Sequence, residues 1–394
     1  MIVRGAPGPV RVLVLDGEAR AALATTRALA ARGDEVHVAS AGGRSLAGAS
    51  RWARSEHAVG DASSEPEAWA EKVRTLGRSL EAEVWLPITE VSLGSAYQTG
   101  LDGEEQMACP NRGTYEAIVD KHALLERAAR LGVHVPRSRL IESPEELDGL
   151  PAGFRYPAIL KPRRSRFWQD GRWHSADVWI VHDAQDLARR RADPDLRAGC
   201  LVQEYIPGHG EAVFLLTERG EPRVRFAHQR LREKPPTGGQ SVLRASIAPD
   251  PELLDWSERL LADLAWSGPA MVEFRRARDG RAALMEINPR LWGSLQLAID
   301  AGVDFPSLFV DLFLGRAVPV VEARLGVRTR WLLGDVEHLL SCLRHSHLRR
   351  ELDLSVWRLA AGFLASFVDG TRTEIFRPSD LRPFLRELAG WRRD

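Results

Sequence analysis

Cysteine is scarce in this chain, and the three that occur, Cys109, Cys200 and Cys342, are widely spaced among 394 residues. No CxxC or Cys/His pattern accompanies them, which argues against a disulfide framework and against a zinc site of the usual spacing. We expect each cysteine to be a small buried or half-buried apolar residue.

Long apolar runs are also missing. No stretch reaches the roughly 18–20 residues needed to cross a bilayer, and the segment Met1–Val14 lacks the apolar core and cleavage site of a signal peptide. With 44% hydrophobic and 27% charged residues, the composition is typical of a globular protein. We therefore expect a cytoplasmic protein without a membrane partner. The formal net charge of zero argues against nucleic acid as a partner.

Lysine and asparagine are rare as well. Of 54 basic residues only four are lysines, and there are two asparagines: Lys72, Lys121, Lys161, Lys234, Asn111 and Asn288. A lysine ammonium is a compact point charge that the planar guanidinium of arginine does not replace. In a chain that otherwise uses arginine, the lysines are therefore candidates for sites that need a point charge.

The first part of the chain alternates apolar strands with amphipathic helices. The expected elements are strand Val10–Leu15, helix Ala19–Ala31, strand Glu35–Ala39, helix Glu67–Leu80 and strand Val84–Ile88. This alternation predicts a parallel sheet in a Rossmann-like domain over residues 1–110. The first strand runs into Asp16-Gly17 and not into GxGxxG, so a nicotinamide cofactor is unsupported.

The pattern changes at about Pro110 to mixed helices and strands, which predicts an α+β domain. The expected elements are helices Thr114–Arg130 and Pro251–Leu264, with strands Pro157–Pro162, Cys200–Tyr205, Ala212–Thr217, Val224–Arg230, Ala270–Phe274 and Ala282–Ile287. The last 70 or so residues are largely helical in pattern, with amphipathic segments at Trp331–Leu343 and Leu354–Phe367.

Two apolar strands each contain one acid, Glu273 in MVEF and Glu286 in LMEINPR. A turn at Asp279-Gly280 between the strands would place the two carboxylates side by side. With the amide oxygen of Asn288 they would form a hard oxygen site, which suits Mg²⁺ with its remaining ligands from water and phosphate. The alternative is a pair of strand glutamates that face solvent, and either glutamate taken alone favours it. Together with Asn288, one of only two asparagines, and with Pro289-Arg290 directly after it, the pair favours the metal site.

The segment MEINPR resembles the metal-binding strand of ATP-grasp enzymes, a group that includes biotin carboxylase, carbamoyl-phosphate synthase and the D-alanine ligases. Further segments from about Pro110 to Gly315 follow in the family's order. They are DKHALLERAARLGVHVP from Asp120, PAILKP with Lys161, LVQEYIPG over Leu201–Gly208, and Glu211. The resemblance implies a pre-ATP-grasp domain (1–110), an N-terminal lobe (111–200), a C-terminal lobe with the metal site (201–320) and a helical C-terminal extension (321–394).

The resemblance also implies roles for individual residues. Lys121 and Lys161 would contact the phosphates of ATP, and Glu211 the ribose. The adenine would lie along the hinge, with the side chain of Gln203, the backbone of Glu204 and Ile206, and the adjoining Tyr205. Glu273, Glu286 and Asn288 would hold one or two Mg²⁺ or Mn²⁺ ions, and Arg290 would bind a substrate carboxylate in a two-pronged bond.

Two segments bear on the substrate. Where many family members have a glycine-rich phosphate lid, residues 163–173 hold one glycine, four arginines and three aromatics, namely RRSRFWQDGRW. This stretch is expected to be a lid, a substrate-recognition loop, or a surface loop packed through its aromatics. Residues 230–241 match the position of a Gly-Gly substrate loop, and its Arg232 and Lys234 are candidates to stabilise an acyl phosphate. Loop composition alone indicates only a turn.

Three further features carry weaker expectations. Thr89-Glu90 follows a predicted strand at the edge where open α/β sheets bind ligands. His338, His345 and His347 lack HExxH spacing and are expected to be structural. The C-terminal helices could cover the ATP-grasp core or form a homodimer face.

The predicted function is an ATP- and magnesium-dependent ligase. It would activate a small carboxylate as an acyl phosphate, couple it to an amine, and release ADP and phosphate. One alternative is a bicarbonate- or carbamate-activating enzyme like one half of carbamoyl-phosphate synthase. Another is a non-catalytic ATP-binding protein.

Overall fold

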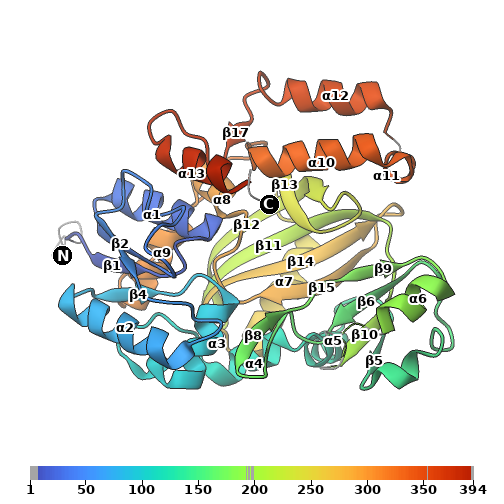
Figure 1. The fold of residues 1–394 in the computed structure, drawn as a ribbon, viewed down its shortest axis with the longest axis horizontal. Helices are drawn as coiled ribbons and strands as arrows, with labels where there is room; N and C mark the ends of the chain where they lie inside the picture. Colours follow the sequence, from blue (N-terminus) through green and yellow to red (C-terminus); the bar gives the residue numbers. More distant parts are fainter. Residues whose placement is uncertain (1–7, 192, 194–195, 197–198, 353, 392–394) are drawn as a thin grey trace. The chain divides into compact units, whose positions relative to one another are not determined.

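The computed structural model describes residues 8–191, 193, 196, 199–352 and 354–391 (Figure 1). The chain divides into two compact units. Unit 1 consists of Met1–Cys109, Arg223–Ala248 and Arg290–Asp394, and unit 2 of Pro110–Pro222 and Pro249–Pro289. Each unit is therefore built from segments far apart in the sequence. The four-part division expected from the sequence stays a prediction.

Unit 1 begins with a parallel four-stranded sheet of order β3-β2-β1-β4. Its elements are β1 (Arg11–Val14), α1 (Arg20–Arg32), β2 (Glu35–Ser40), β3 (Ser55–Ala58), α2 (Pro66–Ser79), β4 (Val84–Leu86), α3 (Glu90–Thr99) and a short 3₁₀ turn, Leu101–Gly103. Leu13, Trp69 and Trp85 are buried in its core. The Rossmann-like first domain expected from the alternating pattern is confirmed.

Asp16 forms hydrogen bonds that join two segments at the edge of this sheet where the carboxyl ends of the strands lie. It follows β1 with a positive φ of 57°, and its Oδ2 accepts hydrogen bonds from the Ile88 and Thr89 amides at 2.9 and 2.8 Å. The Ser92 hydroxyl donates to the same oxygen at 2.6 Å. Burial raises the pKa of Asp16, and these hydrogen bonds lower it only in part. The end of β1 is thereby tied to the start of α3.

The remainder of unit 1 is sheet and helix from the later segments. The strands are β12 (Glu221–Lys234), β13 (Gln240–Ser246), β16 (Arg328–Arg330) and β17 (Arg372–Thr373). The helices are α8 (Leu295–Asp300), α9 (Phe305–Phe313), α10 (Leu332–Arg344), α11 (Ser346–Glu351), α12 (Val356–Ala365) and α13 (Arg382–Trp391). Helices α10 and α12 lie side by side (Figure 1). The helical C-terminal region expected from the sequence is confirmed.

Unit 2 holds two antiparallel sheets and a hairpin. One sheet has the order β5-β10-β6-β9, the other contains β15-β14-β11, and β7 pairs with β8. The strands are β5 (Ser138–Ile141), β6 (Ala158–Pro162), β7 (Arg166–Gln169), β8 (Arg172–Ser175), β9 (Trp179–Val181), β10 (Cys200–Glu204), β11 (Gly208–Glu218), β14 (Gly268–Ala277) and β15 (Ala282–Asn288). The helices are α4 (Arg112–Val119), α5 (Lys121–Arg130), α6 (Ala184–Arg191) and α7 (Pro251–Asp263), with a 3₁₀ turn at Pro144–Leu147. The predicted α+β character is confirmed.

The single helix expected over Thr114–Arg130 is wrong. The chain leaves helical geometry at Asp120 (φ −80°, ψ 98°), which separates α4 from α5. The Asp120 carboxylate accepts a hydrogen bond from the Ala123 amide at 3.2 Å and so caps the second helix. The apolar period continues across this break, which is why the pattern alone suggested one helix.

The two substrate segments are also more regular than the loops expected. Most of residues 163–173 lies in the β7–β8 hairpin, whose turn has positive φ at Asp170 (51°) and Gly171 (76°). Asp-Gly is a favoured pair for such a two-residue turn. In the second segment, β12 continues to Lys234, so Arg232 and Lys234 are strand residues. No helix of the described residues is long and apolar enough to span a membrane.

A buried ion cluster holds unit 1 together around Glu374. This carboxylate, 2% exposed, lies 2.5 Å from Nη2 of the fully buried Arg244 and 2.9 Å from Nη1 of Arg20. Burial would raise the pKa of Glu374, but the two arginines lower it below its ordinary value. Removal of one partner of such a cluster leaves an uncompensated buried charge.

Glu374→Ala is expected to lower the free energy of unfolding by about 3–5 kcal/mol, because Arg244 would keep its charge without its carboxylate. Chemical denaturation measures this loss. The matched control is Glu71→Ala in α2, since Glu71 is 68% exposed in its ion pair with Arg74 and such pairs contribute at most about 1 kcal/mol. Equal effects of the two substitutions would contradict the assignment.

Glu387 on α13 is expected to make stability depend on pH. Burial raises its pKa to about 7, while its Oε1 accepts a hydrogen bond from Nε1 of Trp331 at 2.5 Å. The unfolded chain releases this proton near the ordinary pKa of 4.5, so folding stability falls as the pH rises from there to about 7, by at most about 3 kcal/mol. Glu387→Gln, neutral at every pH, should flatten this fall in denaturation curves. Glu71→Gln is the control, and an unchanged slope in Glu387→Gln would refute the expectation.

Candidate functional site

Two carboxylates lie opposite each other on neighbouring strands of unit 2. In the antiparallel pair β14–β15, Glu273 is the direct partner of Glu286, and Met271 is that of Asn288. The connection between the strands turns at Asp279-Gly280, as the sequence predicted. Like charges directly opposite each other destabilise a sheet. Nearby positive charge is therefore needed to offset the repulsion between the two carboxylates.

Two lysines supply that charge. Nζ of Lys161 lies 3.6 Å and Nζ of Lys121 3.9 Å from Oε2 of Glu286. Lys161 also donates to the Met285 carbonyl at 2.9 Å, and Lys121 to the Ser165 hydroxyl at 2.6 Å. Both lysines are almost fully buried, at 6% and 4% exposure. Burial lowers the pKa of Lys161, an effect that the charge of Glu286 offsets only in part.

The local structure explains how each lysine reaches this place. Strand β6 buries Ala158 and Leu160 in a core with Val202, so Lys161 points to the opposite face. Lys121 is the first residue of α5, directly after the Asp120 cap. A cation is unfavourable at a helix N-terminus, where the backbone dipole already attracts anions. Lys121 and the start of α5 thus add to one anion-attracting region.

The donor set fits a small divalent cation that carries other ligands. Glu273 and Glu286 offer carboxylate oxygens, and Asn288 donates through Nδ2 to Oε1 of Glu273 at 2.8 Å. The amide of Asn288 also carries an oxygen of the kind that binds hard cations. Within the described residues, no group of three or more His, Cys, Asp or Glu side chains could hold a metal. Two carboxylates and an amide suit Mg²⁺, which takes its remaining ligands from phosphate and water.

The segment predicted to line adenine is the end of β10 and the residues after it. Gln203 is on the same face of the sheet as Lys161, and its Nε2 donates to the Ser138 hydroxyl at 2.9 Å. Glu204 accepts from the Arg137 amide at 2.9 Å, and the carbonyl of Ile206 accepts from Nε of Arg275 at 3.3 Å. Tyr205 lies between them, outside the strand.

Glu211, the predicted ribose ligand, already has strong partners. Its two oxygens accept from Nε and Nη2 of Arg276, each at 2.9 Å, and His209 lies 2.8 Å from Oε1. Burial would raise the pKa of Glu211, but His209 and Arg276 lower it below its ordinary value. A ribose hydroxyl would have to share this carboxylate. Arg276 was not singled out from the sequence, because nothing in its local pattern names its partner.

The three cations predicted to act on the substrate are all in unit 1, each with a carboxylate partner. Nη2 of Arg290 lies 3.1 Å from Oε1 of Glu90. Glu90 is the residue that, with Thr89, was predicted to lie at the ligand-binding edge of the first sheet. Nε of Arg232 lies 3.0 Å from the fully buried Asp335. Lys234 pairs with Glu337 and keeps 40% of its side chain exposed.

The arginine-rich stretch forms part of a small cavity in unit 2. Pro162, Arg163, Arg164 and Phe167 line a hollow of about 220 Å³. Arg163 donates to Oδ2 of Asp120 at 2.8 Å, which ties the stretch to the start of α5. Trp168 and Trp173 meet edge to face across the hairpin, with ring centroids 5.7 Å apart. The roles of residues 163–173 as a phosphate lid or as a substrate-recognition loop stay predictions.

Of the three histidines expected to be structural, His338 is buried, with Nδ1 2.7 Å from the Glu233 carbonyl. Burial lowers the pKa of His338, which agrees with a neutral structural residue.

Comparison with known proteins identifies one family segment and one curated relative. Residues 197–334 match the family model described as "ATP-grasp in the biosynthetic pathway with Ter operon". The uncharacterized protein y4rH of Sinorhizobium fredii is 28% identical over 233 residues, which cover 52% of this chain and 44% of the relative. The chain thus spans less than half the length of this relative.

Solved structures share the fold at low sequence identity. Biotin carboxylase from Campylobacter jejuni, in complex with an ATP analogue, aligns with a TM-score of 0.64 and 16% identity over 81% of this chain and 74% of its own. An ADP complex of N5-carboxyaminoimidazole ribonucleotide synthetase gives 0.65 and 15% over 85% of each chain. L-amino acid ligase from Bacillus licheniformis gives 0.58 and 16% over 78% and 75%. The chain therefore has the ATP-grasp fold, and residues 197–334 resemble one ATP-grasp family, as the motifs predicted.

Proposed function

We propose that this chain is an ATP- and magnesium-dependent ligase. It activates a small carboxylate as an acyl phosphate and joins it to an amine, with release of ADP and phosphate. The observation that carries the proposal is the convergence of Lys121 and Lys161 on Glu286, beside Glu273 and Asn288. The ATP-grasp fold and the likeness to an L-amino acid ligase support it.

The cluster suits a polyphosphate for electrostatic reasons. Phosphoryl transfer is catalysed mainly by positioning and by neutralisation of charge on the phosphates. Lys121 and Lys161 are buried point charges that can contact phosphate oxygens once a bound cation takes over Glu286. Mg²⁺ held by Glu273, Glu286 and Asn288 would neutralise the phosphate charge at this place.

The proposed reaction has two steps. An oxygen of the substrate carboxylate forms a bond to the γ-phosphorus of ATP, the bond to the bridging oxygen breaks, and ADP leaves. The amine nitrogen then bonds to the acyl carbon, the carbon–oxygen bond to phosphate breaks, and the nitrogen loses a proton. Arg290 is proposed to orient the carboxylate by a two-pronged bond, and Arg232 and Lys234 to stabilise the acyl phosphate.

The proposal also covers the contacts to the nucleoside, the metal ion, the cellular location and the oligomeric state. Gln203, Glu204, Tyr205 and Ile206 are proposed to receive adenine and Glu211 the ribose, with Mn²⁺ as a substitute for Mg²⁺. The expectations of a cytoplasmic location and of a homodimer belong to the same proposal.

Two substitutions should separate the phosphate contacts from the metal contacts. Lys161→Met is expected to weaken ADP binding roughly 10- to 100-fold with or without Mg²⁺, because one charge-assisted hydrogen bond is lost. Glu286→Gln should abolish the gain in affinity that Mg²⁺ provides and leave metal-free binding undiminished, since it removes an acid near the phosphates. Calorimetry with ADP measures both.

Lys72→Met is the matched control, because Lys72 is an exposed lysine on α2 in the other unit. Nucleotide affinity equal to wild type in Lys161→Met, or an intact Mg²⁺ effect in Glu286→Gln, would rule out this assignment of the site.

The acyl phosphate should be detectable by trapping. With Mg-ATP, hydroxylamine and a pool of acids, mass spectrometry is expected to find the hydroxamate of the true substrate. Arg290→Lys should raise KM for that acid about tenfold or more with little change in KM for ATP, because the two-pronged bond is lost. Bicarbonate-dependent ADP release without an added acid would favour the carboxylating alternative. Tight ATP binding with no ADP from any acid would favour a non-catalytic protein.

A further inference from the structure

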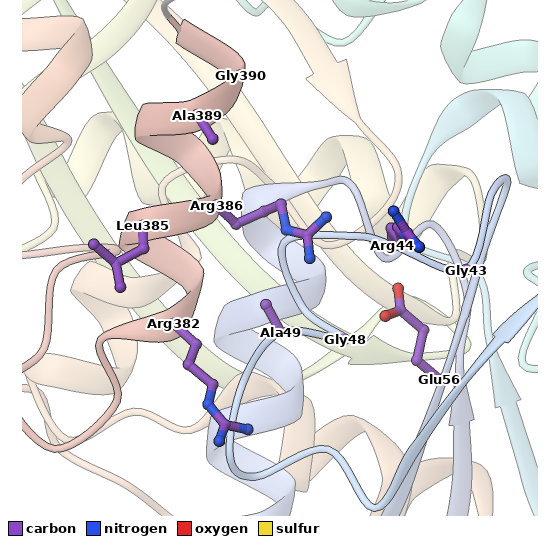
Figure 2. A pocket seen from close by; sticks show the side chains of 10 residues that line it. All are labelled: Gly43, Arg44, Gly48, Ala49, Glu56, Arg382, Leu385, Arg386, Ala389 and Gly390. Atoms are coloured by element: carbon purple, nitrogen blue, oxygen red, sulfur yellow. The ribbon is translucent and has the colours of Figure 1, made fainter.

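A second hollow lies within unit 1, and none of the residues that line it is among those assigned above to ATP. It has a volume of about 840 Å³, a size typical of small-molecule sites. One wall is the segment after β2 with Gly43 and Arg44, together with Glu56 of β3, and the other is α13 with Arg382 and Arg386 (Figure 2). All of these residues are in unit 1.

The two walls are tied together by Asp380, a buried residue just before α13. Its Oδ2 accepts from the Ser50 hydroxyl at 2.6 Å and from Nε of Arg27 at 2.9 Å. Its Oδ1 accepts from the Arg51 amide at 2.9 Å. Asp380 is only 3% exposed, so these bonds are shielded from water. The hollow is therefore a fixed feature of the fold.

Glu56 is held in place with one oxygen still available. Its Oε1 accepts from the Ser45 amide at 2.6 Å and from the Ser40 hydroxyl at 3.0 Å. Gly48 allows this close approach, since a Cβ at that position would lie 2.0 Å from the carboxyl carbon. No described residue donates to Oε2. That oxygen can accept a hydrogen bond from a ligand hydroxyl or ammonium group.

The lining carries more positive than negative charge. Arg44, Arg382 and Arg386 make no hydrogen bond or ion pair with the residues that the structure describes, and all three are exposed. Arg382 and Arg386 leave the same face of α13, four residues apart, and Arg386 extends toward the opposite wall (Figure 2). Like charges at this spacing destabilise a helix. A bound anion would relieve that repulsion.

The opposite face of α13 anchors the helix. Glu387 binds Trp331, as described above, and Nε1 of Trp391 donates to Glu337 at 2.7 Å. The helix that carries Arg382 and Arg386 is thus held in place by hydrogen bonds on its other face. Leu385, 61% exposed, adds an apolar side chain to the lining of the hollow.

We infer that this hollow binds a phosphate monoester of a small hydroxylated molecule. Three guanidinium groups match a dianionic phosphate, which arginine binds through paired hydrogen bonds. Oε2 of Glu56 accepts from the ligand's hydroxyl group, and Leu385 contacts its carbon chain. The volume exceeds what phosphate alone needs. This site is independent of the proposed ligase reaction.

The test is calorimetry of the whole chain with glycerol 3-phosphate as the probe, beside inorganic phosphate and glycerol. Glycerol 3-phosphate is expected to bind more tightly than phosphate, and glycerol not at all. Arg44→Ala, Arg382→Ala and Arg386→Ala should each weaken binding about tenfold. Glu56→Gln should remove the advantage of glycerol 3-phosphate over phosphate, because an amide nitrogen replaces the accepting oxygen.

Two controls keep this result apart from the nucleotide site and from nonspecific charge. Arg358→Ala removes an exposed arginine of α12 in the same unit and should change nothing. Lys161→Met should leave glycerol 3-phosphate binding intact even though it weakens ADP binding. Absence of saturable binding up to about 10 mM, or affinities unchanged in the three pocket arginine variants, would overturn the inference.

Discussion

The opposition of Glu273 and Glu286 on adjacent strands is the constraint around which unit 2 is built. Two carboxylates at one register position repel each other, and the sheet tolerates them because Lys161 and Lys121 approach Glu286 to within 4 Å. Those lysines come from different elements, β6 and α5. The fold of the second unit therefore brings three distant segments to one point, and their charges suit a phosphate chain with its cation.

Unit 1 also contains a buried carboxylate beside cations, but there the cations are arginines. The fully buried Arg244 forms an ion pair with Glu374. Glu374 also forms an ion pair with Arg20. Here one carboxylate of the protein is paired with both guanidinium groups, so the cluster joins three distant segments of unit 1. The carboxylate pair of unit 2 differs, because a bound cation can replace the lysines as partner of Glu286 and free them to contact an anion.

The sequence predicted that the two glutamates lie on neighbouring strands, because the Asp279-Gly280 turn that joins these strands is a local signal. It did not predict the register shift between Glu273 and Phe274, which makes Glu286 the direct partner of Glu273. The break at Asp120 could have been read from its capping aspartate, but the continuous apolar period masked it. The partners of Glu211 and Arg232 could not be predicted. Arg276 and Asp335 are 65 and 103 residues away along the chain, and only tertiary folding pairs them.

The cations at the two proposed anion sites differ in their burial and in their chemistry. At the proposed nucleotide site the two lysines are almost fully buried beside a carboxylate, where a compact ammonium fits. At the hollow beside α13 the cations are exposed and come from long arginines that reach across open space. A planar guanidinium serves there, because a phosphate entering from solvent can be held by paired hydrogen bonds. Compactness of charge thus distinguishes Lys121 and Lys161 from these arginines, whereas the exposed Lys72 belongs to neither site.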